Sequence, residues 1–97
     1  MEQTLKVKER MVLGGILPLE GNALLLKTKK GIIAKIEFSD AERVLLAVEG
    51  AKEEDFEAKI VNFTDAEVET IRVELEKLDK TNKLTDDSLP LYEKFIR

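Results

Sequence analysis

The strongest hydrophobic pattern in the chain lies between residues 65 and 80. Its apolar residues recur at intervals of three, four and three positions, and they are Val68, Ile71, Leu75 and Leu78. That spacing places them on one face of an α-helix, with the charged residues mostly on the other faces. We predict a helix from Asp65 to about Lys80 whose apolar stripe packs on the protein's own core, which is a commoner arrangement than a face left open for a partner helix.

A five-residue motif occurs twice, as Phe38-Ser39-Asp40-Ala41-Glu42 and as Phe63-Thr64-Asp65-Ala66-Glu67. In each copy the Ser or Thr hydroxyl accepts a backbone N–H of the first helical turn, and the Glu three residues later accepts the N–H of the capping residue. Asp at the first helical position suits the positive end of the helix dipole. The motif therefore predicts two helix starts, and the first leads a helix from Asp40 to about Glu49 that ends at Gly50.

Residues 56–63 partly alternate between apolar and polar side chains and include β-branched residues, a pattern typical of a strand. A single strand needs a partner, and the pattern names none. If the chain supplied none, the unpaired edge would favour self-association.

Residues 22–38 fit two different structures. As a helix, they gather Leu25, Ile32 and Ile36 on one face and most of the lysines opposite. As a hairpin, they turn at Lys29-Lys30-Gly31, and the second half alternates. Gly31 inside a helix costs about 1 kcal/mol relative to Ala, which favours the hairpin, but periodicity alone leaves both structures open.

The two end regions are less regular. Residues 4–17 carry a weak helical pattern that Gly14-Gly15 interrupts, and Pro18 with the following Glu20-Gly21-Asn22 marks a turn. Near the other end, we expect Ser88 to cap a short helix that has Pro90 in its first turn.

The amino-acid composition limits the kinds of catalytic and metal-binding sites that the chain can form. The 97 residues include no Cys, no His and no Trp, which excludes disulfides, thiolate zinc sites and Ser–His or Cys–His couples. The net charge of −4 argues against a dedicated non-specific nucleic-acid-binding protein. No apolar run reaches the roughly 20 residues of a membrane span, and residues 1–4 show no secretory signal. We therefore expect a cytoplasmic protein that does not bind membranes.

Acidic clusters give no defined site. Glu53, Glu54, Asp55 and Glu57 lie close in sequence, but the calcium-loop spacing with its central Gly is absent. Nothing in the pattern places two carboxylates around a pocket for acid–base chemistry. We expect no enzyme activity, no metal and no cofactor.

The one candidate binding surface is basic. Residues 1–37 hold seven basic and four acidic side chains, and Lys27, Lys30 and Lys35 share the polar side of residues 22–38 if these form a helix. Such a face can contact phosphates or enter the major groove of DNA, although no aromatic side chain is interleaved to stack on bases. A solvated polar face is the simpler interpretation.

Two stretches of the chain resemble small uncharacterised proteins of tailed phages and prophages. The first runs from Arg10-Met11-Val12-Leu13 through Ile16-Leu17-Pro18 and Glu20-Gly21-Asn22 to Leu24–Lys27, and it is similar to a pattern written ERL..LNLLPKEGN…LTLK. The second comprises Lys77-Leu78-Asp79-Lys80, Lys83-Leu84-Thr85 and Leu91-Tyr92-Glu93-Lys94-Phe95, and it is similar to KLDK..KLT…LYEKF.

The resemblance implies a helix over residues 23–37, because that group lacks the Gly found at position 31. It also implies a phage or prophage gene, and hence a host cytoplasm. It implies no activity and no functional residue. The chain departs from the pattern at Gly14-Gly15 and at Gly31, and its middle segment is shorter.

Together the patterns predict one domain over residues 1–97 with a mainly α, α+β fold. It has about four to five short helices and a minor β element near residues 56–62. The expected core comprises Leu13, Ile16, Leu17, Leu25, Ile32, Ile36, Val44, Leu45, Val48, Ile60, Val68, Ile71, Leu75, Leu78, Leu91 and Phe95.

For function, we expect a small non-enzymatic accessory or regulatory protein of phage type that acts by protein–protein interaction. Its partner is an unidentified protein or another copy of the chain. The alternative is a DNA-binding regulator that uses the basic face at Lys27, Lys30 and Lys35.

Overall fold

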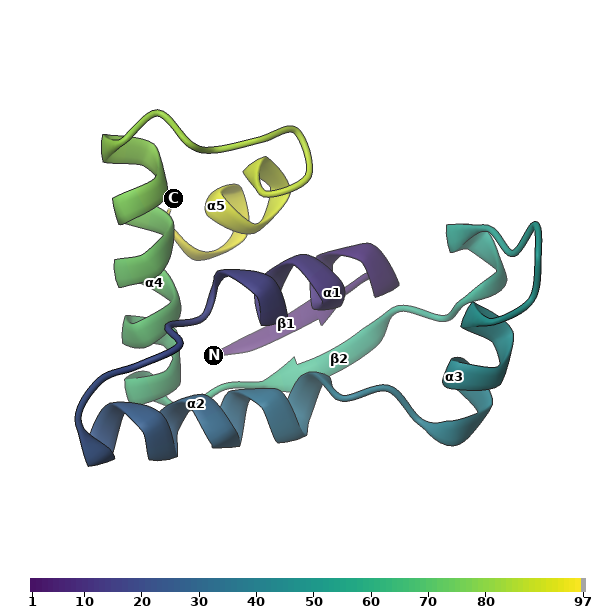
Figure 1. Ribbon diagram of the computed structural model, residues 1–97, viewed down its shortest axis with the longest axis horizontal. Helices are drawn as coiled ribbons and strands as arrows, with labels where there is room; N and C mark the ends of the chain where they lie inside the picture. Colours follow the sequence, from purple (N-terminus) through teal and green to yellow (C-terminus); the bar gives the residue numbers. More distant parts are fainter. Residues whose placement is uncertain (97) are drawn as a thin grey trace.

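The computed structural model describes residues 1–96. In chain order the elements are β1 (Glu2–Leu5), α1 (Val7–Ile16), α2 (Ala23–Ile36), α3 (Asp40–Leu46), a 3₁₀ turn (Glu53–Asp55), β2 (Lys59–Asn62), α4 (Asp65–Lys80) and α5 (Leu89–Phe95). Within these residues, five α-helices and one two-stranded antiparallel sheet form a mainly helical α+β domain (Figure 1). This fold class confirms the prediction from the sequence.

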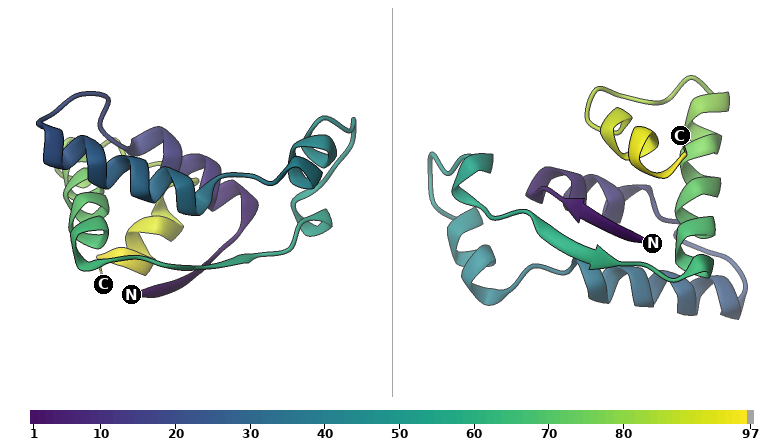
Figure 2. Two further views of the ribbon diagram at one scale, coloured as in Figure 1. Left: turned by 90° about the horizontal axis from the view of Figure 1, so that it is seen from below. Right: turned by 180° about the vertical axis from the view of Figure 1, so that it is seen from behind.

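The predicted strand finds its partner within the chain. β1 pairs with β2 in antiparallel register, with Glu2 opposite Asn62 and Leu5 opposite Lys59. Figure 2 shows the helices of the body on one side of this sheet. The pairing removes the unpaired strand as a reason to expect self-association.

The helices enclose one core beside the sheet. α4 packs against α2 and α5, and α1 lies in contact with all three. The Phe63 and Phe95 rings meet edge to face, with centroids 5.6 Å apart. The buried cluster comprises Leu5, Leu13, Leu17, Ile32, Ile36, Val61, Phe63, Val68, Ile71, Leu75, Leu91 and Phe95.

Three residues expected in the core are exposed. Ile60 is 65% exposed because it lies on the outer face of β2, whereas Val61 and Phe63 face inward. Val44 and Val48 are 70% and 51% exposed because they lie on and just after α3, a helix with no buried residue. Four more expected core residues are only half-buried: Ile16, Leu25, Leu45 and Leu78.

Both capping boxes are confirmed. Ser39 Oγ accepts the Glu42 N–H at 3.2 Å, and Thr64 Oγ1 accepts the Glu67 N–H at 3.2 Å. α3 ends at Leu46 rather than near Glu49, and a turn follows in which Gly50 has a φ of +83°.

The segment that fitted either helix or hairpin is helical. α2 begins after Asn22, whose side chain accepts the Leu25 N–H at 2.8 Å, and it continues through Gly31 to Ile36. Residues 4–17 divide between the end of β1 and α1.

Ser88 holds the N-cap position of α5 as expected, but its side chain makes no capping hydrogen bond to this helix. The Ser88 hydroxyl instead accepts the Thr85 N–H at 2.8 Å, and Thr85 Oγ1 accepts the Ser88 N–H at 3.2 Å. The hydroxyl of Ser88 therefore acts as the Glu does in the other boxes, while Pro90 lies in the first turn as expected.

One region projects from the body. Residues 37–58, which we call the arm, carry α3 and the 3₁₀ turn out to one side of the other helices (Figures 1 and 2). The arm holds eight acidic and two basic side chains, a net charge of −6. No residue of α3 is buried.

Candidate interaction surfaces

The elbow between α2 and the arm is built around Arg10 of α1. Its side chain is fully buried, and its Nε and Nη2 donate to the carbonyls of Ile36 and Glu37 at 3.2 and 2.8 Å. These carbonyls lie at the C-terminal end of α2, where they lack intrahelical donors and where the helix dipole favours a cation. Arg10 thus caps α2 from another element.

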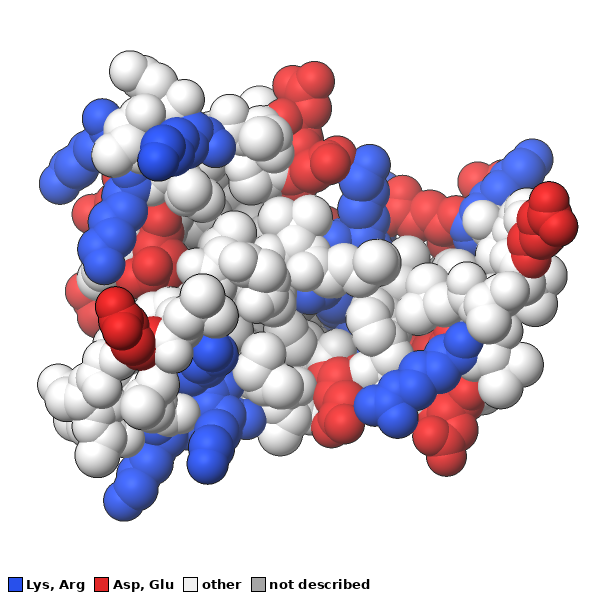
Figure 3. Space-filling model, in the orientation of Figure 1, with Lys and Arg blue, Asp and Glu red and all other residues white. Residues whose placement is uncertain are grey.

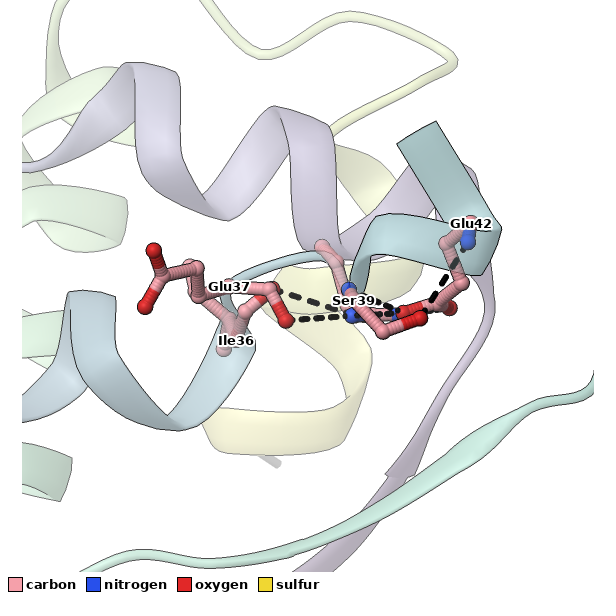
Figure 4. Close-up of polar contacts among 5 residues, drawn as sticks. Ile36, Glu37, Ser39 and Glu42 are labelled. Carbon is pink, nitrogen blue, oxygen red and sulfur yellow. Dashed lines mark hydrogen bonds and ion pairs between the residues drawn. The ribbon is translucent and has the colours of Figure 1, made fainter. Parts of the chain in front are cut away.

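The same guanidinium holds the start of α3. Its Nη1 and Nη2 contact the two oxygens of the Glu42 carboxylate at 2.5 and 3.1 Å, a bidentate pair. Figure 4 shows the elbow residues Ile36, Glu37, Ser39 and Glu42 around these contacts. The hydrogen bond from Arg10, followed by that from the Ser39 N–H, lowers the pKa of Glu42 from 4.5 to about 2. The Arg10 guanidinium carbon also lies 4.3 Å from the Phe38 ring centroid, a cation–π contact.

Glu42 is one of three glutamates that combine a helix cap with a contact between elements. Glu9, Glu42 and Glu67 each accept the N–H of their own capping residue. Each also pairs with a cation from another helix: Glu9 with Lys94 at 2.8 Å, Glu42 with Arg10 and Glu67 with Lys35 at 2.5 Å. The helix starts are therefore tied into the tertiary structure by the same side chains that begin them.

The lysines proposed from the sequence do not form one uniform face. Lys27 and Lys30 are exposed on the outer side of α2, but Lys35 is half-buried and its ammonium is paired with Glu67 of α4. Figure 3 shows basic side chains at the lower left, along α2, and both acidic and basic ones over the arm at the right. Lys27 and Lys30 thus remain as candidates for contact with a partner, while Lys35 has a structural contact.

Gly31, whose intrinsic preference favoured a hairpin over a helix, leaves space for the ion pair between Lys35 and Glu67. A β-carbon built at position 31 would lie 2.7 Å from Glu67 Oε2. Burial would raise the pKa of Glu67, but the hydrogen bonds from Lys35 and from the Thr64 N–H outweigh burial and hold this pKa below its ordinary value. Glycine in α2 therefore allows a buried, charged carboxylate to pack directly against the helix backbone.

The arm presents a mixed apolar and acidic surface. On α3 the exposed side chains include Val44 and, just beyond the helix, Val48, while half-buried Leu45 lines a hollow with Asp55, Phe56 and Glu57 of the same arm. An open hollow with a volume of about 500 Å³ lies where the arm joins the body. That hollow is lined by Ala34, Glu37, Phe38, Ser39, Glu42, Glu57, Ala58 and Lys59.

The acidic cluster of the arm forms no metal site in the described residues. Glu53–Asp55 make a 3₁₀ turn in which the Asp55 carboxylate accepts the Lys52 N–H at 2.8 Å. Across residues 1–96, no group of three or more Asp or Glu side chains is placed to hold a metal ion.

Tyr92 is the one tyrosine in the chain. Burial and the neighbouring Asp79 raise its pKa, which keeps the phenol protonated rather than making it a nucleophile.

Comparison of the chain with protein-family models, with curated proteins and with solved structures found no match. Among residues 1–96, no helix is long and apolar enough to cross a membrane. The molecule is therefore described by its own fold, which is a small α+β domain with a projecting acidic arm.

Proposed function

We propose that the chain is a small non-enzymatic accessory or regulatory protein that acts by binding another protein, and that the arm is its binding surface. The observation that carries this proposal is the exposure of α3. The helix buries none of its residues, yet it is held in one orientation by the bidentate contact between Arg10 and Glu42.

A helix of seven residues is too short to be stable in isolation. The Ser39 cap and the contact between Arg10 and Glu42 supply the stability that the backbone hydrogen bonds of α3 alone do not. A preformed helix loses less conformational entropy on binding than a disordered segment does. The exposed Val44 on this helix, with Val48 just beyond it, suits the binding mode in which an apolar helix face lies in a partner's groove.

The resemblance to phage and prophage proteins supports the same proposal. It implies a host cytoplasm, in which a protein partner of the host or of the phage would be available. The absence of His and Cys from the sequence supports a role that depends on surface complementarity.

The test is affinity capture from bacterial lysate with tagged protein, with and without nuclease. Val44→Asp with Val48→Asp places charges on the exposed side of the arm and should abolish capture of a stoichiometric protein. The matched control is Leu19→Asp, because Leu19 is 92% exposed and lies outside the arm. Capture that both variants retain would contradict the arm as the binding surface.

The second candidate is a DNA-binding regulator, which the exposure of Lys27 and Lys30 favours. α2 contains four lysines and no acidic residue. Binding would weaken steeply with salt, because phosphate contacts release counterions. Lys27→Glu with Lys30→Glu should abolish it, while Lys80→Glu with Lys83→Glu should not. Recovery of proteins only without nuclease would favour this function over the first.

A further inference from the structure

We infer that the partner of the arm is a second copy of this chain, with the arm of each copy against the outer face of α2 in the other. The inference rests on the proposed function, since it names the partner of the same surface. Such an arrangement has two-fold symmetry and contains the same contact twice.

The charges of the two surfaces are complementary. Four of the arm's acidic groups already have partners: Glu42 pairs with Arg10, Glu37 and Asp40 with Arg43, and Asp55 caps the 3₁₀ turn. The other four, Glu49, Glu53, Glu54 and Glu57, are exposed and form no ion pair with a described residue.

On α2, Lys35 is taken up by Glu67, which leaves Lys27 and Lys30 exposed and without an ion pair among residues 1–96. Unpaired acidic groups on the arm thus match unpaired basic groups on α2. Opposite charges on two such surfaces favour encounter and fix their register.

The outer side of α2 also carries small and apolar side chains beside its two lysines. At helical spacing, Ala23, Lys27, Lys30 and Ala34 share the outer side of α2. The two alanines lie at the ends of this side, and the exposed lysines between them can reach acidic groups of a facing surface. Leu24 and Ile33 flank it as exposed apolar side chains. The arm offers the exposed Val44, Ala47 and Val48 to such a face.

Within one chain only the end of this side of α2, at Ala34, lies near the base of the arm. Arg10 holds the Ile36 and Glu37 carbonyls and the Glu42 carboxylate together, which fixes the elbow. Figure 1 shows α3 beyond the C-terminal end of α2 rather than along its outer face. Only another molecule can bring an arm to that face, and a two-fold axis lets both molecules do so at once.

The test is the mass of the purified protein by sedimentation and light scattering over a range from about 1 μM to about 1 mM, which spans Kd values of ordinary weak dimers. The wild type should pass from monomer to dimer. Lys27→Glu with Lys30→Glu should weaken the dimer at least tenfold, and so should Glu49→Lys with Glu54→Lys. Lys80→Glu with Lys83→Glu, also exposed, is the matched control and should leave the dimer unchanged.

Charge reversal on both surfaces makes the test specific. An equimolar mixture of the two reversed variants should form a heterodimer, because each acidic α2 then meets a basic arm. The chain that carries all four substitutions should dimerise again. A loss of folding in any variant would be visible in its circular dichroism and would not produce this recovery.

A wild type that stays monomeric up to 1 mM would overturn the inference. So would a dimer that neither reversed variant weakens, or a mixture that gives no heterodimer. A monomeric protein whose arm still captures another protein in the valine test would overturn the second copy as partner and leave the proposed function standing.

Discussion

α3 and α4 begin with the same five-residue motif and end up in opposite environments. In both, Ser or Thr and the following Glu form a complete capping box. α4 then runs for 16 residues with Val68, Ile71 and Leu75 buried, whereas α3 runs for seven residues with none buried. The motif determines where a helix begins, and the residues after it determine whether the helix joins the core.

The fourth helical position shows how the two diverge. In α4 it is Val68, which is buried like Phe63 before the cap, and these are the two positions of a hydrophobic staple. In α3 it is Arg43, which is exposed. Phe38 therefore lacks an apolar partner at that position, and the guanidinium of Arg10 lies over its ring. A tertiary contact substitutes for a local one, so α3 depends on α1 for its position.

The largest expected effect tests that dependence. Arg10→Met should destabilise the protein by about 3 kcal/mol, because it leaves Glu42 and two helix-end carbonyls without their donor. Chemical denaturation measures the loss. Hydrogen exchange should show the arm opening before the body. The control is Arg43→Met, since the exposed Arg43 pairs should contribute at most about 0.5 kcal/mol. If Arg10→Met and Arg43→Met lowered the free energy of unfolding equally, the claim that buried Arg10 holds the elbow together would be contradicted.

Replacing one apolar side chain by Ala in each helix compares the packing of α4 and α3 directly. Ile71→Ala in α4 should cost about 3 kcal/mol, because it opens a cavity at a fully buried position. Val44→Ala in α3 should change the free energy of unfolding by less than about 0.5 kcal/mol. Urea denaturation of the two variants measures both, and a comparable loss at Val44 would mean that α3 is packed.

Acid should loosen the arm through Glu42. The pKa of this carboxyl is lowered to about 2 in the folded protein, so its contribution is fully present above its ordinary value. It disappears as the pH falls from about 4.5 to about 2. The loss should reach about 2 kcal/mol after allowance for solvent screening. Stability measured from pH 7 to pH 2 should therefore fall less in Arg10→Met than in the wild type, and parallel curves would argue against this pair.

Gly31 tests the way α4 is anchored. Gly31→Ala should destabilise the protein by about 1–2 kcal/mol, because the new methyl group displaces the Glu67 carboxylate from Lys35. In a Glu67→Ala background the same change should stabilise α2 by up to about 1 kcal/mol, the ordinary preference of a helix for Ala over Gly. A double-mutant cycle of Gly31→Ala and Glu67→Ala measures this change of sign. If the two substitutions had additive effects on the free energy of unfolding, the close contact between position 31 and the Glu67 carboxylate would be refuted.

The smallest effects come from the two caps. Thr64→Ala should lower the global stability by about 1 kcal/mol, since α4 unfolds with the core. Ser39→Ala removes an equivalent hydrogen bond but should be seen mainly as faster amide exchange within α3. A global loss of equal size at Ser39 would show that the arm unfolds together with the body.

The sequence predicted those features that depend on neighbouring residues. The capping boxes, the length of α4 and the existence of a strand at β2 follow from local spacing. The burial of Ile60 was predicted wrongly, because the alternation left open which face of β2 looks inward. β1 and its pairing were missed, since four residues at the start of a weak pattern carry no signal of their distant partner.

The candidate site was less predictable than the fold. Exposure of Lys27 and Lys30 follows from helix periodicity, but the pairing of Lys35 with Glu67 depends on how α2 and α4 pack. Arg10 gave no sign of its central position, because a buried arginine is indistinguishable by sequence from a solvated one. Gly31 favoured the wrong structure by its intrinsic preference, and only the neighbouring carboxylate explains its place in a helix.

The pairing of β1 with β2 also affects how the protein folds while it is being synthesised. Glu2 lies opposite Asn62, so during synthesis β1 leaves the ribosome long before its partner. At about 5–20 residues per second the wait lasts several seconds, during which Leu5 and the strand's hydrogen-bonding edge stay uncovered. Folding of this core is therefore delayed until β2 and α4 emerge, because Leu5 and β1 have no partner before then.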